Sequence, residues 1–174
     1  MLCRDKENKT EKCAKYWDEN NKMEKYIIKI KNEDERENYI TREITLYNNS
    51  SKNQKTIQQI NFISWPDHGV PKIEGGKIFI TFIEMINEVD KFRGNNPIVV
   101  HCSAGVGRTG TFISMYCLYK EITKQIDNKE KEIQFSIFNL VRKIKEMRIL
   151  MVQTEVQYQF IHYFVRYLLS KLNK

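Results

Sequence analysis

One loop of this sequence carries residue types that together can transfer a phosphoryl group. Cys102 opens the loop and Arg108 closes it, with Gly105 and Gly107 between them. An apolar, β-branched run before the cysteine predicts a short buried strand at 98–100, and a helix is predicted to follow the arginine. A glycine-containing turn between a strand and a helix N-terminus directs backbone N–H groups inward, where they and the helix dipole favour an anion.

In such a cradle Cys102 is expected to be a nucleophile. Inward N–H groups, the helix N-terminus and the Arg108 guanidinium should lower the thiol pKa below its usual value of about 8.5. The planar Arg108 fork can hold two oxygens of one phosphoryl group, which predicts phosphoryl transfer through a cysteinyl-phosphate. The backbone amides expected to bind the phosphate belong to Ser103, Ala104, Gly105, Val106 and Gly107. The simpler alternative makes Cys102 a small buried hydrophobic residue.

Three segments, in the expected order, resemble motifs of the classical, tyrosine-specific protein tyrosine phosphatases. Residues 101–110, His-Cys-Ser-Ala-Gly-Val-Gly-Arg-Thr-Gly, resemble the signature loop of that family. Residues 65–71, Trp-Pro-Asp-His-Gly-Val-Pro, resemble its mobile acid loop, and 153–160, Gln-Thr-Glu-Val-Gln-Tyr-Gln-Phe, resemble its glutamine loop. The resemblance covers nearly the whole chain and implies hydrolysis of phosphotyrosine in proteins, without a metal or cofactor.

The resemblance implies roles for residues outside the signature loop. Asp67 would protonate the leaving phenolic oxygen and later act as a base, on a loop that Trp65 anchors by packing. Without the signature loop downstream, Asp67 would be interpreted as an ordinary turn aspartate between two prolines. Gln153 would orient the water that hydrolyses the cysteinyl-phosphate.

Two neighbours of the nucleophile have candidate supporting roles. The Thr109 hydroxyl can donate a hydrogen bond to the Cys102 sulfur and help to expel it, although a threonine in a first helical turn is also ordinary. His101 could act as a base, but the family resemblance implies a side chain that braces the loop and tunes the thiolate. We expect the bracing role.

Gln157 has a structural explanation beside a functional one. Thr154 and Gln157 have the spacing of a capping box, which would start the last helix. Gln153 precedes the cap and has no such local explanation. We therefore assign the water-orienting role to Gln153 ahead of Gln157, which stays a candidate for substrate binding.

Residues 13–17, Cys-Ala-Lys-Tyr-Trp, resemble a further segment of the family. By the same alignment, Glu7 matches a glutamate that pairs with the signature arginine, and Lys12 matches a lysine that faces the acid loop. Either could equally be a solvated surface charge. The family's phosphotyrosine recognition loop has no counterpart here. We therefore expect a domain shortened to about its C-terminal two-thirds, and two alternatives stay open: a non-catalytic phosphotyrosine-binding module and a phosphatase of broader specificity.

The elements that must position these residues predict one α/β domain over residues 1–174. Residues that are β-branched or aromatic, in partial alternation, predict a meander of strands at 26–31, 39–47 and 57–63. Apolar residues at helical spacing predict helices at 74–93, 109–122, 133–148 and from 154 onward. The expected fold is a twisted mixed, largely antiparallel sheet flanked by helices, as in the protein tyrosine phosphatases.

Composition limits the class of protein and its partners. Hydrophobic residues make up 41% and charged residues 29% of the 174, and no apolar run approaches the roughly 20 residues that span a bilayer. The four cysteines (Cys3, Cys13, Cys102 and Cys117) lack paired metal-ligand spacing and are too few for a disulfide framework, so we expect a reducing, cytoplasmic location. The net charge of +7 is not gathered into a stripe, so we expect no nucleic-acid partner but an attraction for acidic phosphopeptides.

Overall fold

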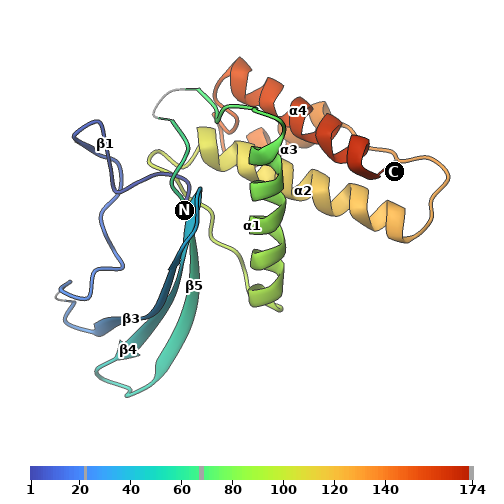
Figure 1. Ribbon diagram of the computed structural model, residues 1–174. Helices are drawn as coiled ribbons and strands as arrows, with labels where there is room; N and C mark the ends of the chain where they lie inside the picture. The colour runs from blue at the N-terminus through green and yellow to red at the C-terminus, as the bar shows by residue number, and fades with distance from the viewer. Residues whose placement is uncertain (22, 67–68, 173–174) are drawn as a thin grey trace. The chain divides into compact units, whose positions relative to one another are not determined.

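The computed structural model describes residues 1–21, 23–66 and 69–172, which belong to two compact units. The first unit is Met1–Trp65 and the second is Pro66–Lys174 (Figure 1). In the part of the chain that the structure describes, the first unit contains only strands and the second only helices. Each unit has its own core, so the two are described in turn.

The first unit is built on a three-stranded antiparallel meander. It consists of β3 (Tyr26–Glu35), β4 (Tyr39–Asn48) and β5 (Gln54–Phe62), which confirms the three predicted strands. Strand β3 runs further than predicted because a register shift between Ile30 and Asn32 lets a polar stretch continue its pairing with β4. The residues at 32–35 lie beyond the predicted strand because they are polar, as a connection between strands would be.

A short hairpin precedes the meander and was not predicted. Strands β1 (Lys6–Glu7) and β2 (Thr10–Glu11) pair through a two-residue turn in which Asn8 and Lys9 have φ angles of 49° and 65°. Positive φ at both central residues matches the right-handed twist of paired strands. Strands of two residues are too short to show a hydrophobic alternation in the sequence.

The N-terminal segment packs on the meander to form the core of the first unit. Met1, Cys3 and Trp17 form one buried cluster with Ile28 of β3 and Ile44 of β4. The indole of Trp17 also makes a cation–π contact with Arg42, a buried residue of β4 whose guanidinium carbon lies 5.1 Å from the ring centre. The tryptophan of the 13–17 motif is therefore a core residue.

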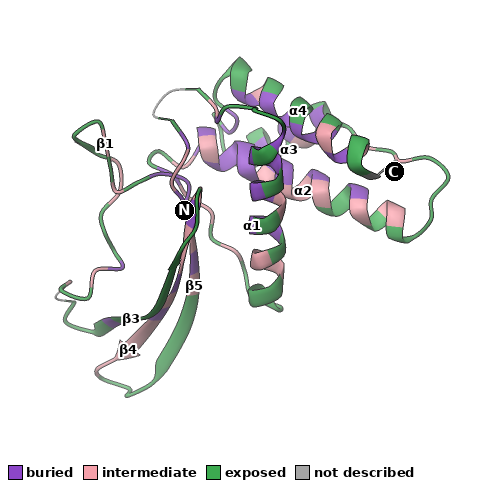
Figure 2. Cartoon of the chain, viewed as in Figure 1, coloured by how far each residue is buried: buried purple, intermediate pink, exposed green. Residues whose placement is uncertain are grey.

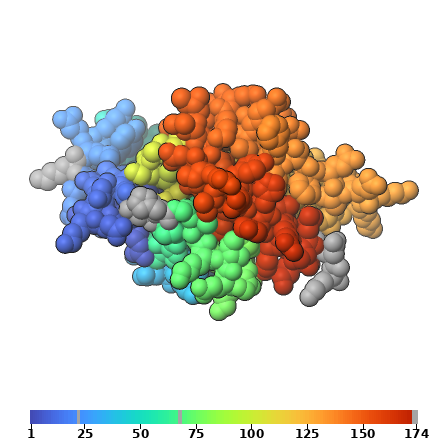
Figure 3. All heavy atoms as spheres, turned by 90° about the horizontal axis from the view of Figure 1, so that it is seen from above, coloured from blue at the N-terminus to red at the C-terminus, as the bar shows by residue number. Residues whose placement is uncertain are grey.

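The second unit consists of α1 (Lys77–Arg93), α2 (Gly107–Asp127), α3 (Ile137–Met147) and α4 (Glu155–Leu172). These helices confirm all four that were predicted, and α2 contacts both α3 and α4. Buried residues concentrate in the N-terminal half of α2 (Figure 2). In the space-filling view, the atoms of α3 and α4, coloured from orange to red, lie directly against one another (Figure 3). The core side chains of the four helices include Phe79, Phe82, Phe112, Met115, Ile144, Phe160 and Phe164.

The predicted strand at 98–100 is wrong. No strand is assigned there, and neither described sheet includes this segment. Val99 is 82% exposed instead of buried, and Ile98 and Val100 are half-buried. A β-branched apolar run favours an extended backbone, but a strand also requires a hydrogen-bonded neighbour, which the described residues do not supply here.

Candidate active site

Cys102 lies in a tight turn at the N-terminus of α2. Its Sγ accepts a hydrogen bond from Thr109 Oγ1 at 3.1 Å and from the backbone N–H groups of Gly105, Val106 and Thr109. The left-handed backbone of Gly105, with φ of 71°, helps to turn successive N–H groups toward the same side. These donors form a cup around the sulfur, and the side chain is only 8% exposed.

The cup lowers the pKa of the Cys102 thiol. Burial alone would raise that pKa, but the Thr109 hydroxyl and the backbone N–H groups stabilise the thiolate and outweigh the burial. Burial raises the pKa of the thiols of Cys13 and Cys117, around which the described residues place no such set of donors. Cys102 is thus buried, as the simpler interpretation expected, and also the thiol of these three most easily ionised.

His101 contacts the backbone of the same turn. Its Nδ1 lies 3.2 Å from the carbonyl oxygen of Cys102, and the half-buried ring has a lowered pKa chiefly because burial disfavours the imidazolium. The contact of Nδ1 with the Cys102 carbonyl supports the bracing interpretation, which stays a prediction.

Arg108 lies in the first turn of α2 and reaches toward the predicted acid loop. Its Nη2 donates a hydrogen bond to the carbonyl oxygen of Pro66 at 3.1 Å. Asp67 itself lies outside the described residues, so its predicted place beside the cup stays a prediction. In the first unit, Trp65 is buried and its ring meets that of Phe62 edge-on at 6.0 Å, as an anchor residue requires.

The two predicted supporting charges lie in the first unit. Glu7 Oε1 accepts a hydrogen bond from the backbone N–H of Arg4 at 3.1 Å, and the backbone N–H of Lys12 donates to the backbone carbonyl oxygen of Asp5 at 2.7 Å. Their expected approach to the signature arginine and to the acid loop stays a prediction.

The capping box predicted at the start of α4 is confirmed. The N–H of Gln157 donates to Thr154 Oγ1 at 3.3 Å, and Gln157 Oε1 accepts from the backbone N–H groups of Thr154, at 3.3 Å, and of Gln153, at 2.9 Å. Gln157 is buried, whereas Gln153 is exposed. The structural explanation of Gln157 therefore holds, and Gln153 keeps a side chain that can meet solvent.

Both glutamines lie against the start of α2. A Cβ atom added to Gly107 would lie 2.9 Å from Gln157 Nε2 and 3.2 Å from Gln153 Oε1. The glutamine loop and the cup are thus in contact, although they are far apart in the sequence. Glycine at position 107 permits this close approach.

Residues that sequence reasoning missed attach the glutamine loop to the cup. The backbone N–H of Val152 donates to the Val106 carbonyl at 3.3 Å, and Arg148 Nη2 donates to the Ala104 carbonyl at 3.3 Å. Met151 packs on Val106 in a small core cluster with α3. Only the position of Arg148, between the predicted third helix and the glutamine loop, could have indicated such a role from the sequence.

The segment that leads from α3 into the glutamine loop has a strained backbone. Leu150 and Val152 have φ angles of 65° and 56°, in the left-handed region that non-glycine residues avoid. Such a conformation costs about 1–3 kcal/mol per residue and persists only where surrounding contacts hold it. Strain immediately before Gln153 therefore indicates that the path of the chain into this residue is fixed by its neighbours.

We expect Gly110→Ala to destabilise the protein by about 2 kcal/mol, because overpacking a close backbone contact forces the structure to shift. The added Cβ would lie 2.4 Å from the backbone nitrogen of Val152 and 3.1 Å from the Met151 carbonyl carbon, and neither can swing aside. Gly107→Ala is the matched comparison, because its Cβ would meet side-chain ends and no backbone atom. Gln153 is exposed and can move aside, whereas Gln157 is held by the capping box, so a cost of about 1 kcal/mol, smaller than for Gly110→Ala, is expected. Urea unfolding measures both, and a Gly110→Ala variant as stable as the parent would contradict the contact.

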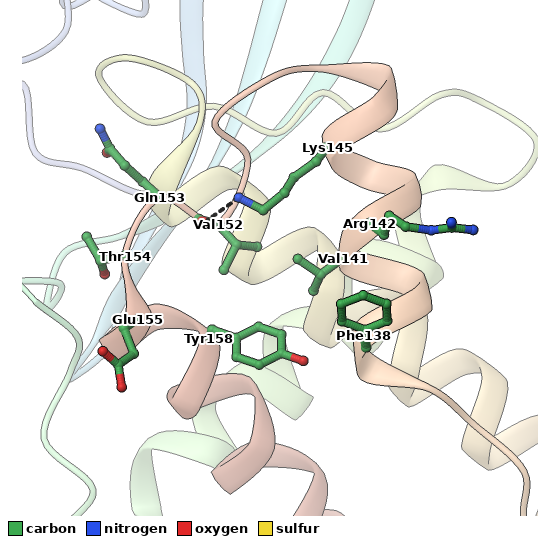
Figure 4. Close-up of a pocket in the computed structure, with 9 residues that line it drawn as sticks. All are labelled: Phe138, Val141, Arg142, Lys145, Val152, Gln153, Thr154, Glu155 and Tyr158. Carbon is green, nitrogen blue, oxygen red and sulfur yellow. Dashed lines mark hydrogen bonds between the residues drawn. The ribbon is translucent and has the colours of Figure 1, made fainter.

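A pocket of about 480 Å³ lies between α3 and the start of α4. Val141, Val152, Phe138 and Tyr158 line it with apolar surface, and Gln153 forms part of its edge (Figure 4).

Among the residues that the structure describes, no group of three or more His, Cys, Asp or Glu side chains could hold a metal ion. Within the same described part, no helix has the length and apolarity needed to cross a membrane.

Comparison with known proteins identifies the class of this domain. Residues 1–167 match the family model described as protein-tyrosine phosphatase, and the chain belongs to that family. It also resembles the solved structure of the catalytic domain of human protein tyrosine phosphatase non-receptor type 18, with a TM-score of 0.80 and 28% identity, over 96% of this chain and 58% of that one. The expected α/β phosphatase fold is thereby confirmed.

The similar proteins include one whose name marks it as receptor-type and one whose name does not. The chain is 34% identical over 165 residues to tyrosine-protein phosphatase 2 of Dictyostelium discoideum, covering 93% of this chain and 42% of that protein. It is 33% identical over 164 residues to receptor-type tyrosine-protein phosphatase alpha of Homo sapiens, covering 93% of this chain and 19% of that protein. The chain thus spans less than half the length of these curated relatives.

Proposed function

We propose that this chain hydrolyses phosphotyrosine in proteins through a cysteinyl-phosphate intermediate. The observation that carries the proposal is the cup of hydrogen-bond donors around Cys102, which lowers the pKa of a thiol at a helix N-terminus. An ionised sulfur needs no separate base to act as a nucleophile. The same cup and helix terminus favour the dianionic phosphoryl group that is the target of the attack.

In the first step, the Cys102 thiolate attacks phosphorus and the bond from phosphorus to the tyrosine oxygen breaks. Asp67 donates its proton to that oxygen, so a neutral phenol leaves. The backbone N–H groups of 103–107 and the Arg108 guanidinium hold the other phosphoryl oxygens. In this scheme these donors supply the positive field, so no metal or cofactor takes part.

In the second step, a water oxygen attacks phosphorus and the bond to sulfur breaks. Asp67, now a carboxylate, takes a proton from the water, which Gln153 orients, and inorganic phosphate leaves. The Thr109 hydroxyl, 3.1 Å from Sγ, stabilises the departing thiolate. His101 braces the backbone of Cys102 throughout.

Residues of the first unit have proposed supporting roles. A carboxylate at Glu7 would fix the orientation of the Arg108 fork before substrate binds. Lys12 would face the acid loop, and Trp65 would anchor it. Gln157 supports Gln153 through the capping box and borders the phosphate site at Gly107.

The proposed partners are proteins that carry phosphotyrosine, and the proposed setting is the cytoplasm and its signalling pathways. The net charge of +7 favours acidic segments around the phosphorylated residue. A reducing compartment keeps the Cys102 thiol, which forms no disulfide in the structure, available as a nucleophile.

We expect the chain to hydrolyse a phosphotyrosine peptide with acidic flanking residues at least about 100-fold faster than the same peptide carrying phosphothreonine, in the presence of EDTA. The phenol of tyrosine, with a pKa of about 10, is a far better leaving group than the much less acidic alcohol of threonine. Phosphate release measures the rates. Similar rates for both peptides would select the broader-specificity phosphatase, and tight binding of the tyrosine peptide without release would select the binding module.

A further inference from the structure

We infer that Lys145 is a positioning residue for the second step, because its ammonium fixes the backbone that presents Gln153 to the cup. The inference rests on the function proposed above. Lys145 Nζ donates a hydrogen bond to the carbonyl oxygen of Val152 at 3.1 Å. Figure 4 shows the lysine extending from α3 along the pocket edge to the residue immediately before Gln153.

Val152 is held on both sides of its α-carbon. Its N–H donates to Val106 in the cup at 3.3 Å, and its carbonyl accepts from Lys145. Two fixed peptide groups determine the φ and ψ angles of the residue between them, and φ is 56° at this β-branched residue. Because this conformation is disfavoured, the surrounding contacts must maintain it, and Lys145 supplies one of them.

The position of Gln153 depends on this conformation. Its side-chain Oε1 would lie 3.2 Å from a Cβ at Gly107, so it is placed at the N-terminus of α2, beside the phosphate site. The N–H of Gln153, in the same peptide group, donates to Gln157 Oε1 at 2.9 Å. If the Val152 carbonyl loses the lysine, this one bond is left to hold the peptide group, so Val152 can relax toward the common negative φ and turn the following side chain away. The cup itself retains its Thr109 and backbone donors to Cys102, so the first step should not change.

The contact differs from that of an ordinary surface lysine. Lys145 is an exposed residue of α3, yet its ammonium binds the carbonyl of the buried Val152, which lies in the segment that follows the helix. Arg142, on the same helix, lies 3.8 Å from a helix neighbour, Glu146, as surface charges commonly do. The lysine bond instead joins α3 to the glutamine loop.

The test is Lys145→Met, which keeps the aliphatic stem and removes the donor. With p-nitrophenyl phosphate, a substrate with a good leaving group, hydrolysis of the intermediate should limit kcat, whereas kcat/KM reports only the first step. We expect kcat to fall about tenfold, kcat/KM to stay within twofold, and a burst of nitrophenol to precede the slow phase. Lys145→Arg, which restores a donor, should recover most of kcat.

Lys143→Met is the matched control, since it removes the same charge from an exposed position of the same helix; no change is expected. Equal losses in kcat and kcat/KM, no loss at all, or no recovery in Lys145→Arg would overturn the inference. Amide hydrogen exchange gives a readout that does not need activity: faster exchange at Val152 and Gln153 in Lys145→Met, but not in Lys143→Met, is expected. If the parent chain shows no turnover, the proposed function fails, and unchanged exchange would separately refute the positioning role.

Discussion

Cys102→Ser is expected to reduce the hydrolysis of aryl phosphates by at least about 10⁴-fold, because it removes the attacking atom of the reaction. The serine hydroxyl is nearly the same size as the thiol and can accept the same hydrogen bonds from Thr109 and the backbone. Its pKa is far above that of a thiol, however, so these donors cannot ionise it near neutral pH. Release of p-nitrophenol from p-nitrophenyl phosphate measures the loss.

The matched control is Cys117→Ser, a half-buried position on the same helix, where burial raises the pKa of the thiol. That variant should keep its activity within about twofold, because nothing near Cys117 stabilises a thiolate. The Cys102→Ser variant should still bind a phosphotyrosine peptide, since the cup remains. Activity that survives in Cys102→Ser would exclude the cysteinyl-phosphate mechanism.

The pH dependence supplies an independent check on the same atom. Because the donors lower the pKa of the Cys102 thiol, the reactive thiolate is present above the lowered pKa and is lost as the pH falls through it. The parent should therefore lose kcat/KM on the acid side. On the basic side, kcat/KM should fall because Asp67 loses the proton that it must donate in the first step.

The sequence predicted the helices well because their cores depend on a regular repeat. Phe79, Phe82, Met85 and Ile86 recur on one face of α1, and all are buried. The end of that periodicity marks the end of the helix at Arg93, followed by Gly94. The strand predicted at 98–100 failed for the opposite reason. An extended run becomes a strand only with a partner, and pairing is a property of the whole sheet rather than of the run.

The site was predictable at the level of motifs but not of contacts. The spacing of Cys102, Gly105 and Arg108 sufficed to predict a cup of N–H groups, because the turn and the helix N-terminus are local features. The bonds from Arg148 to Ala104 and from Lys145 to Val152 join segments whose proximity depends on how α3 packs on α2. A lysine or arginine on an exposed helix face carries no signal of its partner in the sequence.

We expect Arg108→Lys to lower kcat/KM for phosphotyrosine peptides by about 10³-fold, although the positive charge is retained. The guanidinium can hold two phosphoryl oxygens through its planar fork, while an ammonium is a point charge that cannot maintain both bonds as the geometry at phosphorus changes. The substitution also removes the Nη2 donor that lies 3.1 Å from the Pro66 carbonyl, at the start of the acid loop. Arg108→Lys should therefore weaken the binding of inorganic phosphate, measured as a competitive inhibitor, as well as slow the chemistry.

Arg142→Lys is the control for the same chemical change at an exposed position of α3, where the guanidinium lies 3.8 Å from the carboxylate of Glu146. A change below about twofold is expected there, because an exposed ion pair contributes little. If Arg108→Lys behaved like Arg142→Lys, charge alone would hold the phosphate, and the fork would have no role. If it lowered turnover but not phosphate inhibition, the effect would belong to the contact with Pro66 and to the acid loop. Loss of both, at unchanged stability, is the result that the clamp requires.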